Sequence, residues 1–337
     1  MKEDGKMTAK KDIICIGMAL VDSIIKGFDP KPISVSGYRA VSGSLNVGGE
    51  AVNEAVAAAK LGMDTGILCS LGADDAGDMV VGMLNRYGVD TSSVLRSVEH
   101  PTPVTTMFVN DDGTRKSITN QSHKYNFHPE NLSGVFTSAK AIILGSMFRA
   151  PFDAPEIIHS VLKSAKLAGV MVFADTKLPN FRFLKLEDLK ESLPLIDYIT
   201  PNEDEAKYYT GKTEPEDMAD VFLSYGVKNV VIKLGGKGCF FKGINKADTC
   251  KEQSVITDAY KEIYTEIRLP AYDIKAVDAT GAGDTFVAGL ASEFIRGADI
   301  HEALEFANAC GAICTTAVGA GTALRDRQQV LELMKSM

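Results

Sequence analysis

The sequence predicts an open α/β fold in which helices cover both faces of a mostly parallel sheet. Short apolar runs, rich in β-branched residues and ended by Gly, Asp or Pro, recur along the chain, as buried parallel strands do. Segments with helical periodicity separate these runs, and such alternation is typical of α/β proteins. The chain has 337 residues, of which 45% are hydrophobic and 24% charged, so it is expected to be globular with a substantial core.

The strands of this sheet are expected in six apolar runs. They are Ile13–Ile16, Ile67–Leu71, Ala141–Leu144, Val170–Phe173, Tyr198–Ile199 and Val230–Leu234.

Helices are expected between the strands and throughout the C-terminal part. The predicted helices are Glu50–Leu61, Asp75–Tyr87, Ala154–Ala168, Glu203–Thr210, Glu216–Tyr225, Asp284–Arg296, His301–Ala317 and Asp326–Lys335.

Two stretches, Pro32–Asn46 and Pro101–Gln121, break this rhythm. Val104–Val109 and Arg115–Asn120 alternate with a period of two and are joined by the turn Asp111–Gly113, which predicts antiparallel strands outside the main sheet. They form either a hairpin with one solvated face or a β lid over a substrate cleft. The polar, irregular segment Gly243–Thr265 is expected to be a surface insertion, and the sequence assigns it no function.

The charge of the chain excludes large polyanions as partners. The 36 Lys and Arg against 44 Asp and Glu leave a net charge of −8, which repels nucleic acids and anionic membranes, and no basic patch overrides it. Met1 to Lys11 is charged and is expected to be a frayed tail without a signal peptide. The longest uncharged stretch, Phe306–Leu324, contains Asn, Thr and Gly, so a buried helix that runs into a loop is expected there.

The cysteines indicate a reducing compartment. Six of them are spread through the chain and none forms a CxxC pair, so a disulfide framework is not expected and a cytoplasmic location is. Cys310 and Cys314 are spaced to share a metal, but the five histidines supply no second ligand pair at zinc spacing. We therefore expect buried, apolar thiols.

The strongest chemical motif is Asp278–Phe286, a loop of small residues that opens a helix. Free backbone N–H groups and the positive end of the helix dipole meet there, and Gly281, Ala282 and Gly283 allow an anion to approach the backbone. Asp284 lies in the first turn, where a carboxylate would repel that anion unless it has a task such as accepting a proton. The alternative is that Asp284 only caps the helix.

Two standard nucleotide-binding motifs are excluded. A P-loop ending in Gly211-Lys212-Thr213 would need its first glycine where Ala206 stands. In the dinucleotide fingerprint, Gly281 and Gly283 are followed by Phe286 at the position that requires a small residue.

Three motifs together resemble the ribokinase-like (phosphofructokinase-B-type) carbohydrate and nucleoside kinases. Asp278–Asp284 resembles the C-terminal signature of this family, with Ala279 in place of a commoner threonine. Gly48–Gly62 and Thr200–Glu205 match two further signatures of the family. Their order and spacing cover about residues 12 to 325.

The resemblance implies a three-layer α/β/α sandwich with a small β lid. Residues 1–31, 48–100 and 123–337 would form the core, and residues 32–47 and 101–122 a discontinuous lid. It implies an ATP-dependent kinase that phosphorylates a hydroxymethyl group of a sugar such as ribose or fructose. The rival functions are a nucleoside kinase of the same family and a non-catalytic regulator that binds sugar or nucleotide. A homodimer formed through the lid is expected, with no nucleic-acid or membrane partner.

The resemblance also assigns the catalytic and substrate residues. Asp284 would be the general base, and the backbone amides of Gly281, Ala282 and Gly283 the anion hole. The sugar would contact the set Asp22, Gly48, Gly49 and Asn53. For Asp22, the alternative is a solvated loop aspartate.

The nucleotide and cation sites are assigned in the same way. ATP would contact Asn202, Lys233, Gly235, Gly238 and Asn308. Glu205 would organise Mg²⁺ through water, and K⁺ would be held by Asp278, Thr280, Cys314 and Gly319. Asn202 is alternatively a helix cap, and Lys233 either touches a phosphate or faces solvent. Lys177 is a further candidate phosphate contact.

Overall fold

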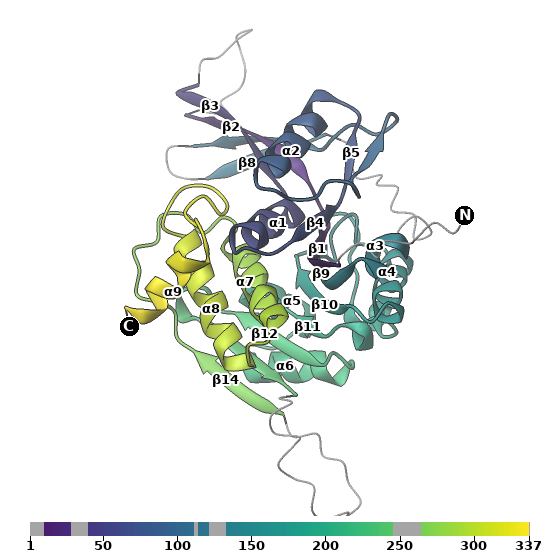
Figure 1. The fold of residues 1–337 in the computed structure, drawn as a ribbon, viewed down its shortest axis with the longest axis vertical. Coiled ribbons are helices and arrows are strands. Elements are labelled where there is room, and N and C mark those ends of the chain that lie inside the picture. Colours follow the sequence, from purple (N-terminus) through teal and green to yellow (C-terminus); the bar gives the residue numbers. More distant parts are fainter. Residues whose placement is uncertain (1–9, 28–39, 111–113, 121–132, 245–263, 337) are drawn as a thin grey trace, which may run out of the picture.

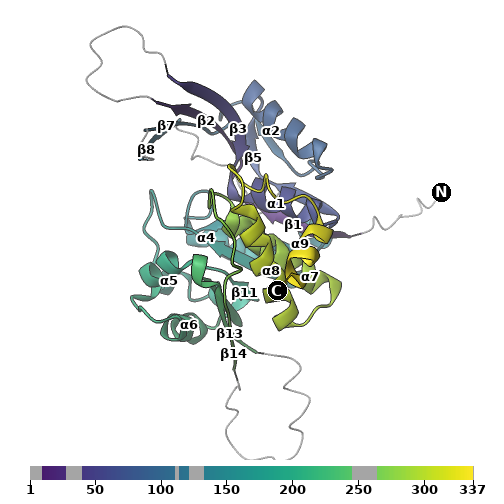
Figure 2. The ribbon, with the colours of Figure 1, turned by 90° about the vertical axis from the view of Figure 1, so that its left-hand side faces the viewer.

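The structure, a computed structural model, describes residues 10–27, 40–110, 114–120, 133–244 and 264–336. Its centre is an eight-stranded sheet with helices on both faces, and a smaller sheet lies beyond one end of it (Figures 1 and 2). The predicted fold class is thereby confirmed.

The central sheet is parallel except at one edge. In spatial order its strands are β14 (Thr265–Leu269), β13 (Cys239–Gly243), β12 (Asn229–Lys233), β11 (Tyr198–Ile199), β10 (Met171–Thr176), β9 (Ala139–Met147), β1 (Lys11–Ile16) and β4 (Thr65–Leu68). β13 and β14 run antiparallel to their neighbours and were not among the predicted strands. The six predicted runs all overlap strands, with at most one residue of each run outside a strand, and Ile67–Leu71 is divided between β4 and β5 (Ser70–Gly72). Lys11, placed in the N-terminal tail by the sequence, is the first residue of β1.

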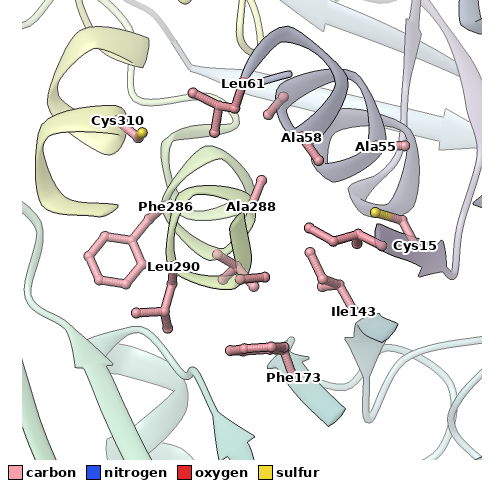
Figure 3. Packing of buried hydrophobic residues seen from close by; sticks show 14 of the residues in the cluster. Cys15, Ala55, Ala58, Leu61, Ile143, Phe173, Phe286, Ala288, Leu290 and Cys310 are labelled. Carbon is pink, nitrogen blue, oxygen red and sulfur yellow. The ribbon is translucent and has the colours of Figure 1, made fainter. Parts of the chain in front are cut away.

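Alternate residues of the strands supply two separate cores. On one face, Cys15, Ile143 and Phe173 pack against α1 (Glu50–Lys60) and α7 (Ala282–Arg296), as Figure 3 shows. On the other face, residues one position away, such as Ile142 and Val172, pack against the opposite helices. This period of two is what strands buried on both faces require.

The remaining helices divide between these two faces. α2 (Asp75–Arg86), α8 (Ile300–Cys314) and α9 (Arg327–Lys335) join α1 and α7, whereas α3 (Ser133–Thr137), α4 (Pro155–Leu167), α5 (Glu203–Thr210) and α6 (Pro215–Ser224) cover the other face. Short 3-10 turns occur at η2 (Leu186–Leu189), η3 (Leu193–Leu195) and η4 (Gly235–Lys237). None of the helices in the described ranges is long and apolar enough to cross a membrane.

The second sheet has four strands in the order β3 (Ser42–Gly48), β2 (Leu20–Lys26), β7 (Val104–Val109) and β8 (Arg115–Thr119). β2 pairs antiparallel with β3 and parallel with β7. The proposed boundary placed Leu20–Lys26 in the core, whereas its hydrogen bonds make it a central strand of this sheet. A separate two-stranded sheet joins β5 to β6 (Leu95–Ser97). The predicted turn Asp111–Gly113, residues 32–39 and most of the insertion lie outside the described residues.

Candidate active site

The candidate site lies where the carboxyl ends of β9, β10 and β12 meet the N-termini of α1 and α7. Ser146 and Asp175 lie near the ends of β9 and β10, Lys177 follows β10, and Lys233 ends β12. An isolated bridge between Asn202 and Lys233 brings the segment after β11 to the same place. This edge of an open α/β sheet is where ligands bind in such folds.

The start of α7 has the form of an anion-binding helix end. Gly281 is left-handed, with φ 76°, and no side chain caps the helix. A Cβ at Gly281 would lie 2.6 Å from the Cβ of Ala320, so only glycine fits this turn. The helix therefore presents its first backbone N–H groups without a side-chain acceptor.

Asp284 is buried in the first turn of α7, with 5% of its surface exposed. Its Oδ2 accepts a hydrogen bond of 2.7 Å from Asn53 Nδ2, and its Oδ1 lies 3.6 Å from Lys177 Nζ. Burial raises the pKa of Asp284, and Lys177 and Asn53 oppose that shift. Asp284 is thus a carboxylate whose proton affinity is increased while a cation still favours its charged form.

Lys177 lies between two carboxylates. Its Nζ is 3.6 Å from Asp284 Oδ1 and 3.8 Å from Glu50 Oε1. Burial opposes the charge on Lys177, but the surrounding carboxylates, Asp284 foremost, raise its pKa. Glu50 is fixed in turn by a 2.6 Å hydrogen bond from Ser146 Oγ. Glu50 and Ser146 had no predicted role in the site, because only their convergence in space marks them.

The residues expected to contact the sugar lie close to Glu50 and Asp284. A Cβ on Gly48 would lie 2.8 Å from Asp22 Oδ2, so β3 passes directly against the Asp22 carboxylate on β2. Burial, and next the charge of Glu50, raise the pKa of Asp22. Asp22 is therefore no freely solvated loop residue. Gly49 begins α1 with φ 101° and no side-chain cap, and Asn53 follows one turn later.

Lys233 points into the site. Its Nζ forms an ion pair with the fully buried Asp175, which also accepts a 2.9 Å hydrogen bond from Thr200 Oγ1. A Cβ on Gly283 would lie 3.2 Å from Lys233 Nζ. The Lys233 ammonium group is thus adjacent to the predicted anion hole. The alternative that Lys233 faces solvent does not hold, because its side chain is only 11% exposed. Asp175 and Thr200 had no predicted role in the site.

Asn202 and Glu205 form a capping box at the start of α5. Asn202 Oδ1 accepts from the Glu205 backbone N–H, and Glu205 Oε2 accepts from the Asn202 backbone N–H, each at 2.9 Å. Thr176 Oγ1 also donates to Glu205 Oε2 at 2.9 Å. The side chain of Asn202 therefore caps the helix, as the alternative interpretation predicted. Burial raises the pKa of Glu205, and Lys233 opposes this shift.

The loop before α7 is tied to the loop after α8. The Asp278 carboxylate accepts from Thr280 N–H at 3.0 Å and from Gly319 N–H at 2.9 Å, and the Cys314 thiol lies 3.5 Å from the Thr280 carbonyl oxygen. The four residues named for K⁺ are thereby brought together. Cys310 and Cys314 are both buried, as expected.

Among the described residues, Asn308 and the glycines of η4 form no hydrogen bond with Asp284. Asn308 Nδ2, in α8, donates a 2.6 Å hydrogen bond to the Pro270 carbonyl oxygen. Gly235 and Gly238 flank the turn between β12 and β13. Asn308 and Gly238 thus lie against the end of β14 and the residue that follows it.

Comparison with known proteins identifies the family of the chain. The model of the pfkB family of carbohydrate kinases matches residues 10–327. A ribokinase of Staphylococcus aureus is 28% identical, with 84% of this chain and 86% of the relative covered. Fructokinase-1 of Oryza sativa subsp. japonica is 26% identical, with 96% of this chain and 98% of the relative covered.

A solved structure of the Arabidopsis thaliana ribokinase, complexed with ribose and ATP, superposes with a TM-score of 0.79. It is 26% identical, and the match covers 97% of this chain and 99% of that one. The match to the family over nearly the whole chain shows what kind of enzyme this is: a phosphotransferase acting on an alcohol group, and a member of the pfkB family of carbohydrate kinases.

Proposed function

We propose that this kinase transfers the γ-phosphoryl group of ATP to a hydroxymethyl group of a ribose- or fructose-like sugar, with Asp284 as general base. The observation that carries the proposal is the buried Asp284 at the uncapped start of α7, hydrogen-bonded to Asn53 and 3.6 Å from Lys177. An acceptor hydroxyl and a transferring phosphoryl group would meet at this carboxylate.

In the proposed step, Asp284 accepts the proton of the sugar hydroxyl as its oxygen attacks the γ-phosphorus. The new P–O bond forms as the bond from the γ-phosphorus to the ADP oxygen breaks, and ADP leaves with that electron pair. The raised pKa of Asp284 favours this proton transfer, because a stronger base accepts a proton more readily. Asp22, Gly48, Gly49 and Asn53 would hold the sugar hydroxyls.

Backbone amides and two lysines would hold the phosphates. The amides of Gly281, Ala282 and Gly283 form the proposed anion hole, and Lys233 lies beside Gly283. Lys177 is the proposed contact to the transferring phosphoryl group, because it already lies against the base. Such groups stabilise the charge that spreads over the phosphoryl oxygens. Gly235, Gly238 and Asn308, with Asn202, would border the rest of the nucleotide.

The residues present fit a hydrated Mg²⁺ near Glu205. Glu205 Oε2 is occupied by Thr176 and Asn202, whereas its Oε1 accepts no hydrogen bond from the described residues and is left for a metal-bound water. Bound Mg²⁺ would neutralise phosphate charge there. Asp278, Thr280, Cys314 and Gly319 would hold K⁺ chiefly through backbone carbonyls, and K⁺ would then stiffen the loop before α7.

The four-stranded sheet is proposed as a lid that closes over the sugar and pairs two subunits. Leu45 on β3 and Ile118 on β8 are 62% and 67% exposed, which supports association through this sheet. Sedimentation equilibrium at several concentrations would test the dimer, and a monomer at all of them would refute it.

The test of the function is an ADP-release screen over pentoses, hexoses, keto-deoxy acids and nucleosides, with and without K⁺. We expect turnover with a neutral pentose or ketohexose, and turnover only with nucleosides would refute the proposal. Asp284→Asn should lower kcat by roughly 10²–10⁴-fold, because general bases contribute about that much. A loss below about tenfold would show that Asp284 is not the base.

A further inference from the structure

Glu54 is a buried acid that the proposed mechanism does not use. It lies on α1, is fully buried, and neither of its carboxyl oxygens has a hydrogen-bond partner. Within the described ranges, only one other buried side-chain oxygen or nitrogen lacks a partner, namely Oδ2 of the equally buried Asp175. Such atoms are rare in folded proteins and call for an explanation.

The two acids with unpartnered oxygens are close together, and Asp284 lies beside them. Carboxylate oxygens of Glu54, Asp175 and Asp284 lie within 4.8 Å of one another. β9 packs directly on Glu54, because a Cβ at Gly145 would lie 2.9 Å from Glu54 Oε2 and 3.1 Å from Oε1. Glu54 is therefore confined beside the other two acids, and water does not reach it.

A single proton would give a partner to one oxygen of Glu54 and to Oδ2 of Asp175. We propose that Glu54 is kept as a neutral carboxylic acid that donates a hydrogen bond to Asp175 Oδ2, and that it is thereby a positioning residue for Lys233. Asp175 would then accept from Glu54 and Thr200 while it pairs with Lys233, so its two oxygens would both be engaged. The effect on catalysis rests on the proposed function, but the protonation state does not.

A proton fits these surroundings better than a metal ion. Lys233 already pairs with Asp175, and Lys177 lies 3.6 Å from Asp284, so a metal ion among these acids would face two ammonium groups. The titratable groups that face Glu54 are Cys15 from β1, Asp175 and Lys177 at the end of β10, Asp284 from α7 and Glu50 from its own helix. Burial first, and then the charges of Asp175, Asp284 and Glu50, raise the pKa of Glu54 well above its ordinary value.

The consequence is a limit on activity at high pH. When Glu54 ionises, a third negative charge is added beside Asp175 and Asp284. That charge removes the hydrogen bond to Asp175, draws Lys233 toward the acids and away from the phosphates of ATP, and repels those phosphates. The KM for ATP should therefore rise as pH increases through the pKa of Glu54.

The first test measures thermal unfolding against pH and needs neither sugar nor nucleotide. A carboxyl with a raised folded-state pKa binds more protons folded than unfolded above the ordinary glutamate pKa, so wild-type stability falls as pH rises there. Glu54→Gln cannot ionise, and its amide replaces the O–H donor. The Tm of Glu54→Gln relative to wild type should therefore increase with pH. A relative Tm that is constant or decreases with pH would overturn the proposal.

The second test compares Glu54→Gln with Glu54→Leu, which keeps the bulk but donates no hydrogen bond. Glu54→Gln should retain most of the turnover and lose the alkaline rise in KM for ATP. Glu54→Leu should raise that KM by about tenfold or more, since a buried charged group is left without its partner. Equal kinetics for both variants would exclude a positioning role.

Infrared spectra settle the protonation state independently of any activity. The carbonyl stretch of a protonated carboxyl should be present in wild type and absent from Glu54→Gln. The rival outcome is a cation, tested with Mn²⁺ alone: an increase in wild-type Tm that Glu54→Gln abolishes would overturn the proposal. If the kinase screen fails while the infrared band and the Tm trend are present, only the proposed function falls.

Discussion

Two consecutive helices, α7 and α8, begin in opposite ways. At α8, Asp299 Oδ1 accepts from the Glu302 backbone N–H at 2.9 Å, and Glu302 Oε2 accepts from the Asp299 N–H at 3.2 Å. At α7, the first residue is preceded by the left-handed Gly281 and no side chain caps the end. Side chains therefore satisfy donors at the start of α8, whereas the first donors of α7 have no side-chain acceptor, which suits the anion proposed to bind there.

Both helices carry an acid in the first turn, but the two acids have different partners. Glu302 is exposed and is used by the backbone of its own helix. Asp284 is buried, and it meets a side chain of α1 and a lysine that follows β10. The same local pattern therefore stabilises a helix in one place and collects groups from three parts of the fold in the other.

The largest loss of activity is expected when α7 is given an acid at the position where the anion is proposed to bind. Gly283→Asp should lower kcat/KM for ATP by at least about 10²-fold, because a carboxylate would occupy the anion hole and pair with Lys233. The fold should survive, since a Cβ there meets only the flexible end of Lys233. Steady-state ADP release measures the loss. Gly82→Asp on exposed α2, with nothing within 4 Å of its Cβ position, is the control and should be silent. Wild-type kinetics for Gly283→Asp would disprove the anion hole.

The next largest effect is expected from the lysine beside that helix end. Lys233→Met removes a charge-assisted contact worth about 1.5–3 kcal/mol, so the KM for ATP should rise roughly 10- to 100-fold. Lys237, whose side chain is 72% exposed and pairs with Glu203, provides the matched control. Lys237→Met should change the KM by less than about twofold. Similar effects of the two variants would contradict a specific phosphate contact.

A smaller effect concerns pH. Because burial raises the pKa of Asp284, the acid limb of kcat/KM should lie above the range of an ordinary aspartate, as the protonated form cannot accept a proton. Asn53→Leu removes a hydrogen bond that lowers this pKa, so it should move the limb to still higher pH. The pH–rate profiles of both proteins test this. A limb that stays in place would show that Asn53 does not act on Asp284.

The smallest effect on activity is expected at α8. Asp299→Ala removes the cap and should lower the free energy of unfolding by about 1 kcal/mol, while kinetic constants remain unchanged. Urea unfolding and ADP release measure the two quantities. A change in KM for ATP would mean that this helix end also contributes to the site.

Local periodicity was sufficient to predict most of the fold. The predicted helices agree with the observed ones to within about three residues at their ends, because apolar stripes and caps are local properties. The place of β2 was not predictable in this way. Leu20–Lys26 has the length and composition of a strand of either sheet, and its pairing with residues 42–48 and 104–109 decides which one.

In the candidate site, too, the residues with a local sequence pattern were predicted, and those that only converge in space were not. The glycines and Asp284 were found because a helix that starts with small residues has a visible pattern. Glu54, Asp175 and Thr200 were missed, because nothing in the local sequence tells that they converge. Asn202 was assigned to ATP, and its side chain proves to cap α5, a role that an N-x-x-E motif serves equally well.

The position of Asp22 places the proposed recognition of the acceptor in a different sheet from the proposed phosphoryl transfer. Asp22 is in register with Asn46 and Thr105 in the four-stranded sheet. Asp284 lies instead on α7, and Lys177 and Lys233 lie at the ends of β10 and β12 in the large sheet. With Asp22 assigned to the sugar as proposed, substitutions in β2, β3 and β7 would change which acceptor is recognised while the phosphoryl chemistry is retained. Under that assignment, new acceptor preferences would arise by divergence of three short strands.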